Sequence, residues 1–310
     1  MDTPTDAKGM GIVPFPVPGS GYRRRREWRK VSWRAERLAP KGVKRTMERD
    51  LHGTGSDRGT MSSSEFPPIR VDLHVHTVAS GHAYSTVEEC ARYAASKGLE
   101  AIAVADHGPA VPGGGNLYHF WNLKVLPRRW HGVWILRSVE ANILDTGGRL
   151  DLPDRVLEKL DLVLAGIHPY TGYEGGSVEE NTRALLAALA HPLVDVIVHP
   201  DNPNYPVDMR RLSEAARRYG KALEVNNSSF VYTREGSDPL CREMVREVKR
   251  VGGLLAVGSD AHVATFAGEF GHAVEIIEQN DVSPQAVINY SIMRLEEFLR
   301  QRGKPLELEG

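Results

Sequence analysis

The chain has 310 residues, of which 41% are hydrophobic and 25% are charged, so it can bury one sizeable core and we expect one main domain. Its two cysteines exclude a disulfide framework and a cysteine-based zinc motif, and this usage favours a reducing cytoplasm. No apolar run reaches the roughly 18 residues that a membrane helix needs. The first residues also lack the apolar core of a signal peptide. We therefore expect a soluble cytoplasmic protein that does not enter a membrane.

The first 68 residues differ in composition from the rest of the chain. Residues 1–60 hold 14 Lys and Arg against 7 Asp and Glu, whereas residues 61–310 hold 25 against 33. The basic run at 23–30 and its Pro- and Gly-rich surroundings show no apolar periodicity, so we predict a basic, disordered extension over residues 1–68. A start codon assigned upstream of the true start at Met61 is one alternative. An arm that binds nucleic acid is the least favoured alternative.

From residue 69 onward, short β-branched runs alternate with helical patterns, which is typical of βα units in a parallel sheet. Seven runs are predicted as strands: Ile69–Val75, Ala101–Ala105, Val133–Val139, Leu162–Ile167, Val194–Val198, Ala222–Val225 and Leu254–Val257. The predicted helices between them include Thr86–Lys97, Val178–Ala190, Asp208–Tyr219 and Pro239–Val251. Right-handed crossovers then favour a closed or nearly closed α/β barrel.

Potential metal ligands follow six of these seven strands. The carboxyl ends of the strands of an α/β barrel meet at one face, so residues that are far apart in the sequence converge there. Two pairs are separated by a single residue, so their side chains can point the same way and bind one ion together. The nine candidate ligands are His74, His76, His82, His107, Glu140, His168, His199, Asp260 and His262.

A single histidine beside a strand is more often structural than a ligand, but here seven of the twelve histidines fall where the strands end. The other five are expected to lie outside the site: His52, His119, His131, His191 and His272. Asp106 is expected either to orient a ligand imidazole or to cap a loop. The glycine run 113–115 is expected to be a flexible lid or a plain loop, because no Lys-Ser/Thr of a phosphate-binding loop follows it.

The ligand types indicate zinc, with manganese or iron as alternatives, because calcium and magnesium prefer shells of oxygen atoms. Nine ligands exceed the need of one tetrahedral ion, so two or three ions are implied. A carboxylate can bridge two ions and an imidazole cannot, so we expect Glu140, rather than Asp260, to hold the ions together. Clustered cations neutralise phosphate oxygens and lower the pKa of a bound water towards ~7. The pattern therefore predicts hydrolysis of a phosphate ester.

The segments VDLHVHT at 71–77, ADHG at 105–108, SVEAN at 138–142, VHP at 198–200 and GSDAH at 258–262 resemble the motifs of the PHP-domain family (polymerase and histidinol phosphatase type). Within that family, SGHAYS at 80–85 and EVNNSSF at 224–230 resemble the YcdX-type zinc phosphatases, over residues 69–303, with residues 304–310 as a tail. The resemblance implies a distorted seven-stranded (β/α)7 TIM-like barrel with three zinc ions.

The same resemblance implies the distribution of the ligands. His74, His76, Glu140 and Asp260 would hold the first ion, His82, His107 and His262 the second, and Glu140, His168 and His199 the third. Glu140, Asp260 and His262 are taken as the catalytic residues.

The predicted function is hydrolysis of a small phosphate monoester by metal-activated water. The first alternative is a phosphodiesterase or exonuclease of the PHP type, but the eight-residue excess of acidic over basic residues in 61–310 disfavours a nucleic-acid partner. The second alternative is a zinc-binding module without enzymatic activity. The sequence leaves the natural substrate and the oligomeric state open.

Overall fold

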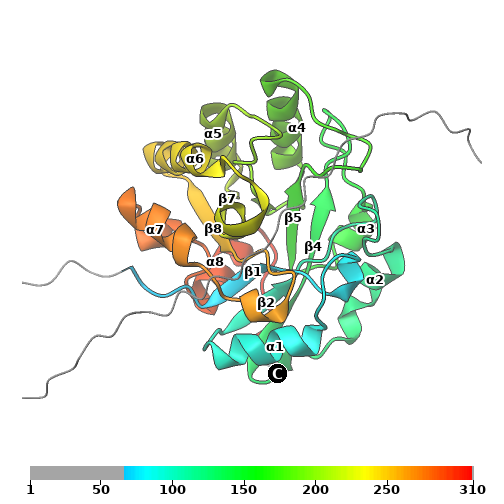
Figure 1. Cartoon of the computed structure of the whole chain (residues 1–310). Helices are drawn as coiled ribbons and strands as arrows, with labels where there is room; N and C mark the ends of the chain where they lie inside the picture. Colours follow the sequence, from blue (N-terminus) through cyan, green and yellow to red (C-terminus); the bar gives the residue numbers. More distant parts are fainter. Residues whose placement is uncertain (1–65, 309–310) are drawn as a thin grey trace, which may run out of the picture. The chain divides into compact units, whose positions relative to one another are not determined.

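Seven parallel strands form a nearly closed barrel in the computed structural model, which describes residues 66–308 (Figure 1). Neighbours follow the order β1 (Val71–Val75), β2 (Ala101–Val104), β4 (Val133–Asn142), β5 (Leu162–Gly166), β6 (Val196–Ile197), β7 (Ala222–Asn226) and β8 (Leu254–Gly258). The predicted α/β barrel of seven strands is confirmed. Residues 1–65, which make up most of the predicted basic extension, lie outside the described residues, so that part stays a prediction.

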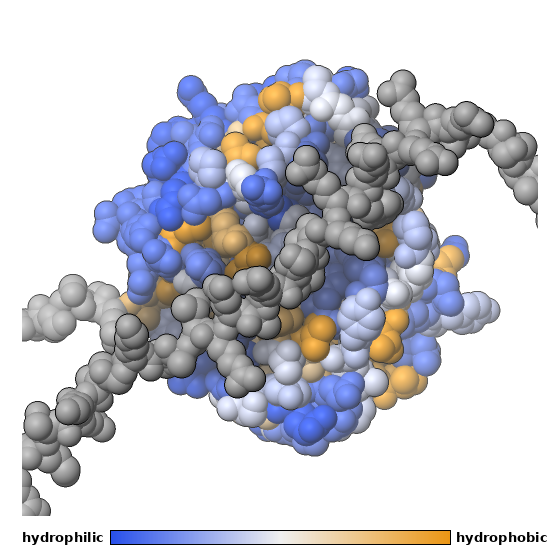
Figure 2. All heavy atoms as spheres, in the orientation of Figure 1, coloured by the Kyte–Doolittle hydropathy of each residue, from blue (hydrophilic) through white to orange (hydrophobic). Residues whose placement is uncertain are grey.

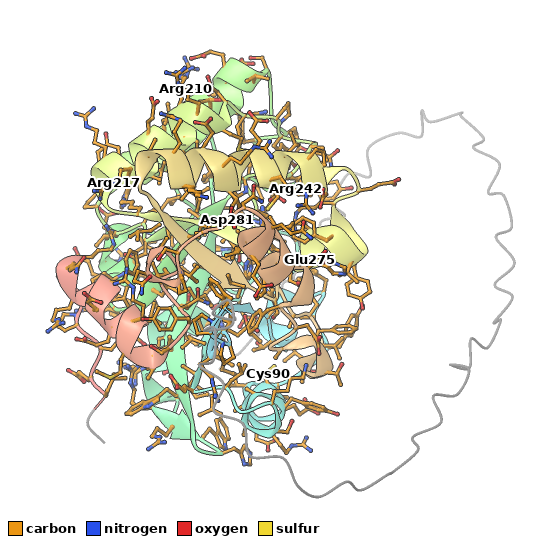
Figure 3. The ribbon with its side chains drawn as sticks, turned by 90° about the vertical axis from the view of Figure 1, so that its left-hand side faces the viewer. Cys90, Arg210, Arg217, Arg242, Glu275 and Asp281 are labelled. Atoms are coloured by element: carbon orange, nitrogen blue, oxygen red, sulfur yellow. The ribbon has the colours of Figure 1, made fainter. Side chains whose placement is uncertain are left out.

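Helices surround the strands, and the four predicted ones are present with small shifts at their ends. The eight helices of the described region are α1 (Val87–Ser96), α2 (Leu117–Asn122), α3 (Asp154–Leu157), α4 (Val178–Ala190), α5 (Met209–Tyr219), α6 (Ser237–Val251), α7 (Gly271–Gln279) and α8 (Ile292–Gln301). Reciprocal hydrogen bonds between Thr86 and Glu89 start α1, and Ser177 with Glu180 starts α4 in the same way. Arg210 and Arg217 project from α5 on the outside of the barrel (Figure 3).

One short strand was not predicted. β3 (Arg129–Trp130) pairs antiparallel with the start of β4, and His131 and Gly132 connect the two strands. Both connecting residues have positive φ angles, 52° and 83°, as the tight turns of two-residue hairpins require. His131 therefore serves a turn, away from the candidate ligands.

The strands are buried on both faces, as expected for a parallel sheet covered by helices. Inside the barrel, small and branched side chains such as Ala103 and Leu164 belong to the same apolar cluster as Leu295 and Phe298 of α8. Helix α8 thus closes the barrel at the end where the strands begin. The open face lies at the opposite end, where the strands finish.

Two sets of contacts close the seam between β1 and β8. At the carboxyl ends, Ala261 pairs with Val75 as in a parallel sheet, and the His76 N–H donates to the Ala261 carbonyl oxygen at 2.9 Å. At the other end, the buried side chain of Asn289 lies between the two strands and hydrogen-bonds to the backbone of both. Its side chain donates to the carbonyl oxygens of Val71 and Val257, each at 2.8 Å, and accepts from the Val257 N–H at 3.0 Å.

The chain continues to pack against the barrel after α8. Arg302 Nε lies 2.7 Å from Asp195 Oδ1, and Lys304 Nζ lies 2.5 Å from Asp195 Oδ2. Leu306 is buried in the same cluster as the barrel interior. These contacts continue past residue 303, where the resemblance placed the end of the domain.

Cys90 of α1, labelled in Figure 3, and Cys241 of α6 are both buried and are not bonded to each other. Among residues 66–308, no helix combines the length and apolar character that crossing a bilayer requires.

Replacing Asn289 by Ala should lower the free energy of unfolding by about 2–4 kcal/mol, because it leaves buried carbonyl and N–H groups of β1 and β8 without partners. The measurement is chemical denaturation of the variant and the parent under the same metal conditions. Asn204→Ala, at an exposed position, is the control and should change stability by less than about 0.5 kcal/mol. Equal effects of the two substitutions would contradict the role of Asn289 at the seam.

Candidate metal centre

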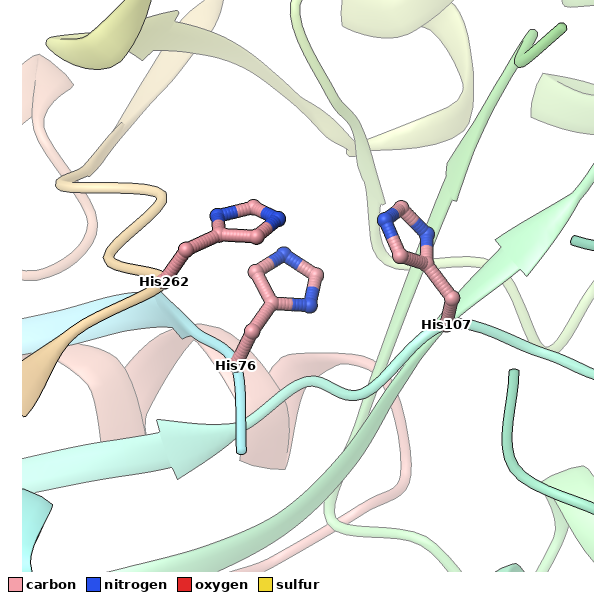
Figure 4. A group of neighbouring side chains, drawn as sticks. All are labelled: His76, His107 and His262. Carbon is pink, nitrogen blue, oxygen red and sulfur yellow. The ribbon is translucent and has the colours of Figure 1, made fainter. Parts of the chain in front are cut away.

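The strand ends bring the nine candidate ligands to the open face of the barrel. His74 and Glu140 lie within β1 and β4, and the other seven lie in the segments that directly follow a strand or, for His82, follow the short helix η1 (Val78–Ser80). Figure 4 shows the rings of His76, His107 and His262 turned towards one another from three different segments. The ring centroids of His76 and His262 are 4.3 Å apart, and those of His76 and His107 are 4.6 Å apart.

Glu140 lies at the centre of this group and is 1% exposed. Its Oε1 atom is 2.9 Å from His168 Nε2 and 2.8 Å from His199 Nε2. Its Oε2 atom is 2.8 Å from His107 Nδ1, 3.3 Å from His74 Nε2 and 3.4 Å from His76 Nε2. The two oxygens of one carboxylate therefore face two different sets of imidazoles.

Several of these atoms have no hydrogen-bond partner although they are buried. They are the Nε2 atoms of His74 and His76, His107 Nδ1 and Glu140 Oε2. Ligands of a tetrahedral zinc ion, each bonded at 2.0–2.1 Å, are about 3.3 Å from one another. The distances from Glu140 Oε2 to His74 and His76, 3.3 and 3.4 Å, are close to that value, and the other three, 2.8–2.9 Å, are hydrogen-bond distances. Three triads of ligand atoms lie within 4.8 Å of one another. The arrangement is therefore able to hold metal ions.

Hydrogen bonds to the opposite ring nitrogen orient four of the imidazoles. Nδ1 of His74 lies 2.7 Å from Glu224 Oε1, and Nδ1 of His76 lies 3.0 Å from Ser80 Oγ. Nδ1 of His82 and of His262 each lie 3.0 Å from a backbone carbonyl oxygen, that of Ser80 and of Asp260. A proton placed on Nδ1 leaves the Nε2 lone pair free towards the centre, which is the tautomer that metal binding needs.

Asp106 supports the site through Ser80. Its carboxylate accepts hydrogen bonds from the Ser80 hydroxyl at 2.7 Å and from the Thr77 N–H at 2.7 Å, and Ser80 in turn contacts His76. His119, which was expected outside the site, places Nε2 3.1 Å from Asp106 Oδ2. Burial would raise the pKa of Asp106, but the hydrogen bonds from His119, Ser80 and Thr77 outweigh it and lower the pKa to about 2.

Glu224 is a supporting residue that the sequence analysis missed. One oxygen contacts His74 Nδ1, and the other accepts from the His199 N–H at 3.0 Å, so this carboxylate ties together candidate ligands from β1 and from the end of β6. Gly258 makes room for it, since a Cβ there would lie 2.2 Å from Glu224 Oε1. A signal for Glu224 was present in the sequence, because an ionisable residue is unusual inside a strand that is predicted to be buried.

Two candidate ligands sit in the left-handed backbone region. The φ angles are 33° at His199 and 54° at Asp260, a conformation that bulky residues rarely adopt. Residues held in this region cluster at active sites, where the surrounding structure fixes them. Here the unusual backbone turns both side chains into the space above the strand ends.

The electrostatics of the site keep both carboxylates ionised. Burial opposes ionisation of Glu140, but His107, His168 and His74 together lower its pKa well below the usual value. Burial lowers the pKa of His76 to about 3, with a further contribution from His107. Burial also lowers the pKa of His199 to about 4, together with Arg234. Burial opposes the charge on His74 and His107 as well, but neighbouring carboxylates, Glu224 and Glu140 at His74 and Glu140 at His107, raise the pKa of both rings. Metal binding needs neutral imidazoles, so it would displace protons from these two rings.

His82 lies at the rim rather than in the centre. It is exposed, and its ring centroid is 5.0 Å from that of His107 and 4.7 Å from that of His262. Its loop packs tightly on the glycine run, because a Cβ on Gly81 would lie 2.6 Å from the Gly113 carbonyl oxygen. The glycine run thus supports the His82 loop through close backbone contact.

A cavity of about 590 Å³ opens above the centre, which is within the usual range for small-molecule sites. Six of the nine candidates line it, and so does Arg234. Arg234, which the sequence analysis did not single out, follows the short helix η3 (Ser229–Thr233) and is mostly buried. Its Nη1 atom lies 3.3 Å from Asp260 Oδ2 and donates to Ser229 Oγ at 3.2 Å.

A parallel α/β barrel with imidazoles and carboxylates gathered at the carboxyl ends of its strands belongs to the class of metal-binding barrels. A comparison with known protein families identifies the family within this class. The model of the PHP domain matches residues 72–309, and the chain belongs to this family.

Curated relatives of the chain are described as probable phosphatases. The chain is 47% identical over 234 residues to a probable phosphatase of Caldanaerobacter subterraneus subsp. tengcongensis, a match that covers 76% of this chain and 92% of the relative. It is 43% identical over 235 residues to a probable phosphatase of Proteus mirabilis, with coverage of 76% and 95%.

Solved structures match the chain at low sequence identity. A chain of archaeal ribonuclease P with mature tRNA has a TM-score of 0.51 and 13% identity, over 75% of this chain and 91% of that chain. A histidinol phosphate phosphatase from Lactococcus lactis, complexed with zinc, L-histidinol and phosphate, has a TM-score of 0.46 and 16% identity, over 69% and 94%. The likeness to the ribonuclease P chain shows the barrel fold alone.

Replacing Glu224 by Gln should weaken metal binding by about 10–100-fold, because the amide cannot serve both His74 Nδ1 and the His199 N–H as an acceptor. Competition against a chromogenic chelator measures the affinity directly. Glu278→Gln, at an exposed position on α7, is the matched control and should leave the affinity unchanged. An unaltered affinity in the Glu224 variant would contradict the orienting role.

Proposed function

We propose that this protein hydrolyses phosphate monoesters at a trinuclear zinc site. The observation that carries the proposal is the position of Glu140, whose two oxygens face two separate sets of imidazoles across distances that suit shared metal ions. The relatives described as probable phosphatases support the same reaction.

The proposed ligand sets are those that the resemblance to the PHP family implies. His74, His76, Glu140 and Asp260 hold the first ion, His82, His107 and His262 the second, and Glu140, His168 and His199 the third. Asp260 Oδ1 lies 3.2 Å from His76 Nε2 and 3.8 Å from His74 Nε2, which supports its place in the first set. Zinc suits this donor set best, and manganese and iron are the alternatives.

When bound, the ions supply positive charge that neutralises phosphate oxygens and activates water for attack on phosphorus. The protein's own groups orient the reactants. Glu140, Asp260 and His262, the proposed catalytic residues, all line the cavity in which the ester binds. Arg234, whose side chain is mostly buried, lines the same cavity and is the proposed contact for a phosphoryl oxygen.

The charge of the cavity favours a small monoester over a nucleic acid. Within the described part of the chain, Arg234 is the one Lys or Arg among the residues that line this cavity. A nucleic-acid groove needs clustered cations to neutralise successive phosphates. The alternatives are a PHP-type phosphodiesterase or exonuclease and a zinc-binding module without activity, and turnover assays separate all three.

The purified protein loaded with zinc or manganese should release phosphate from a generic phosphomonoester, lose at least about 100-fold of its rate after chelation, and regain it when metal is restored. Phosphate release is the measurement, and a bis-ester and single-stranded DNA are the comparison substrates. Faster turnover of the bis-ester or DNA would favour the diesterase. No turnover of any substrate despite full metal loading would favour the non-enzymatic module.

Glu140→Ala should remove at least two of the three ions, because both of its oxygens contact imidazoles of different sets. His82→Ala should weaken mainly one ion, since His82 lies at the rim of the site. Elemental analysis of both purified variants gives the metal content per chain. Equal metal contents would contradict the bridging role of Glu140.

A further inference from the structure

The geometry points to a substrate whose leaving group is a planar aromatic alcohol, held by an aromatic collar above the metal centre. The collar consists of Tyr84, Tyr170, Tyr232 and Phe266. This inference rests on the proposed function and specifies the substrate class of the same site.

Large aromatic side chains are concentrated and exposed at the cavity. The exposed fractions are 77% for Tyr84, 75% for Tyr170, 67% for Tyr232 and 38% for Phe266, and all four line the cavity above the ligands. They come from four separate segments, the loops after η1 and β5 and the short helices η3 and η4 (Ala264–Phe266). Most of the face seen in Figure 2 is hydrophilic, and its apolar residues form small separate groups.

Isolated exposed apolar residues need no explanation, but four rings around one opening indicate a binding surface. Aromatic side chains give large rigid contact areas at low cost in conformational entropy. The collar is therefore suited to bind the leaving group, the part of the substrate that extends away from the metal centre.

The backbone at Tyr170 supports this reading independently. Its φ angle is 65°, in the left-handed region, although the side chain is large and three-quarters exposed. Such a conformation costs about 1–3 kcal/mol and persists where the surrounding structure imposes it. The loop after β5 thus holds an exposed tyrosine ring at the cavity in a conformation that this residue type disfavours.

Two of the collar residues form a pair. The ring centroids of Tyr232 and Phe266 are 5.2 Å apart with an interplanar angle of 41°. Both residues line the cavity above the metal centre and also a neighbouring cavity of about 640 Å³. The two rings therefore lie between the two cavities. On the side of the first cavity, they offer a surface on which a flat ring of the substrate can stack.

The remaining walls of the first cavity favour an apolar leaving group. Val111, Pro112, Pro169 and Val263 line it beside the collar. A sugar or polyol packed against these side chains would leave hydroxyl groups without hydrogen-bond partners, at a cost that a planar ring avoids.

The charges around the collar limit the substrate to one phosphoryl group. Across the described residues that line either cavity, Arg234 is the one permanent cation. Glu269 and Glu275 line the neighbouring cavity, where Glu269 is paired with Lys97 at 2.6 Å and the carboxylate of Glu275 would repel a second phosphate. An aromatic monophosphate satisfies both conditions, whereas a nucleoside diphosphate does not.

In the reaction, the oxygen of water bonds to phosphorus and the ester P–O bond breaks. The aromatic alcohol leaves with one proton from that water, and inorganic phosphate keeps the other hydrogen of the water unless it ionises. No oxidant, reductant or further reactant is needed.

Benzyl phosphate and cyclohexylmethyl phosphate provide the test, because both release a primary alcohol of similar size and differ in the planarity of the ring. The zinc-loaded protein should show a kcat/KM for benzyl phosphate about three- to tenfold higher. Tyr232→Leu and Phe266→Leu should each bring the ratio close to one, mainly by raising the KM for benzyl phosphate. Tyr219→Leu, on α5 away from both cavities, is the control and should keep the ratio of the parent protein.

A ratio near one in the parent protein, or an unchanged ratio in both collar variants, overturns the inference. Turnover of both esters in either case leaves the proposed phosphomonoesterase function standing. No turnover of either ester, or of any other phosphomonoester, by the fully loaded protein overturns the proposed function and the inference together.

Discussion

The structure depends on a single buried carboxylate surrounded by imidazoles. Glu140 is almost fully buried and contacts five histidine rings, and no lysine or arginine neutralises it within hydrogen-bonding distance among the described residues. A buried charge costs several kcal/mol unless cations offset it. Protonated imidazoles offset it only partly, because seven rings crowd the same space and burial disfavours their charge. Bound metal ions would resolve this conflict, and the rest of the barrel holds the candidate ligands close enough together to bind them.

This constraint explains several features that otherwise look unrelated. Glu224 and Asp106 are both buried and fix the tautomers and ring orientations of two candidate ligands. Glu224 contacts His74 directly, and Asp106 acts on His76 through Ser80. Position 258 needs a glycine, because a side chain there would displace Glu224. The strained backbone at His199 and Asp260 aims two further ligands. Each feature is costly or unusual by itself, and each becomes understandable as part of the support for one centre.

The barrel and the candidate ligands could be predicted from the sequence, because short β-branched runs and the residues that end them are local patterns. The residues that the prediction missed act through long-range contacts. Asn289 bridges strands from opposite ends of the chain, and Glu224 contacts a histidine 150 residues away. Neither contact leaves a periodic signal. The short helices α2 and α3 and the two-residue strand β3 were missed for another reason, since they are too brief for a period to appear. Arg234 was passed over because its role depends on which cavity its loop happens to face.

The seam of the barrel has a consequence for how the protein is made. The segments that close the barrel also carry four of the candidate ligands: His74 and His76 lie on one side of the seam, and Asp260 and His262 lie on the other. The hydrogen bond from Ser259 to the His74 carbonyl spans 185 residues of sequence. On a ribosome, the group of candidate ligands thus stays incomplete until the segment that carries Asp260 and His262 has emerged. A nascent chain that is cut short before this segment lacks both the closed seam and part of the candidate centre.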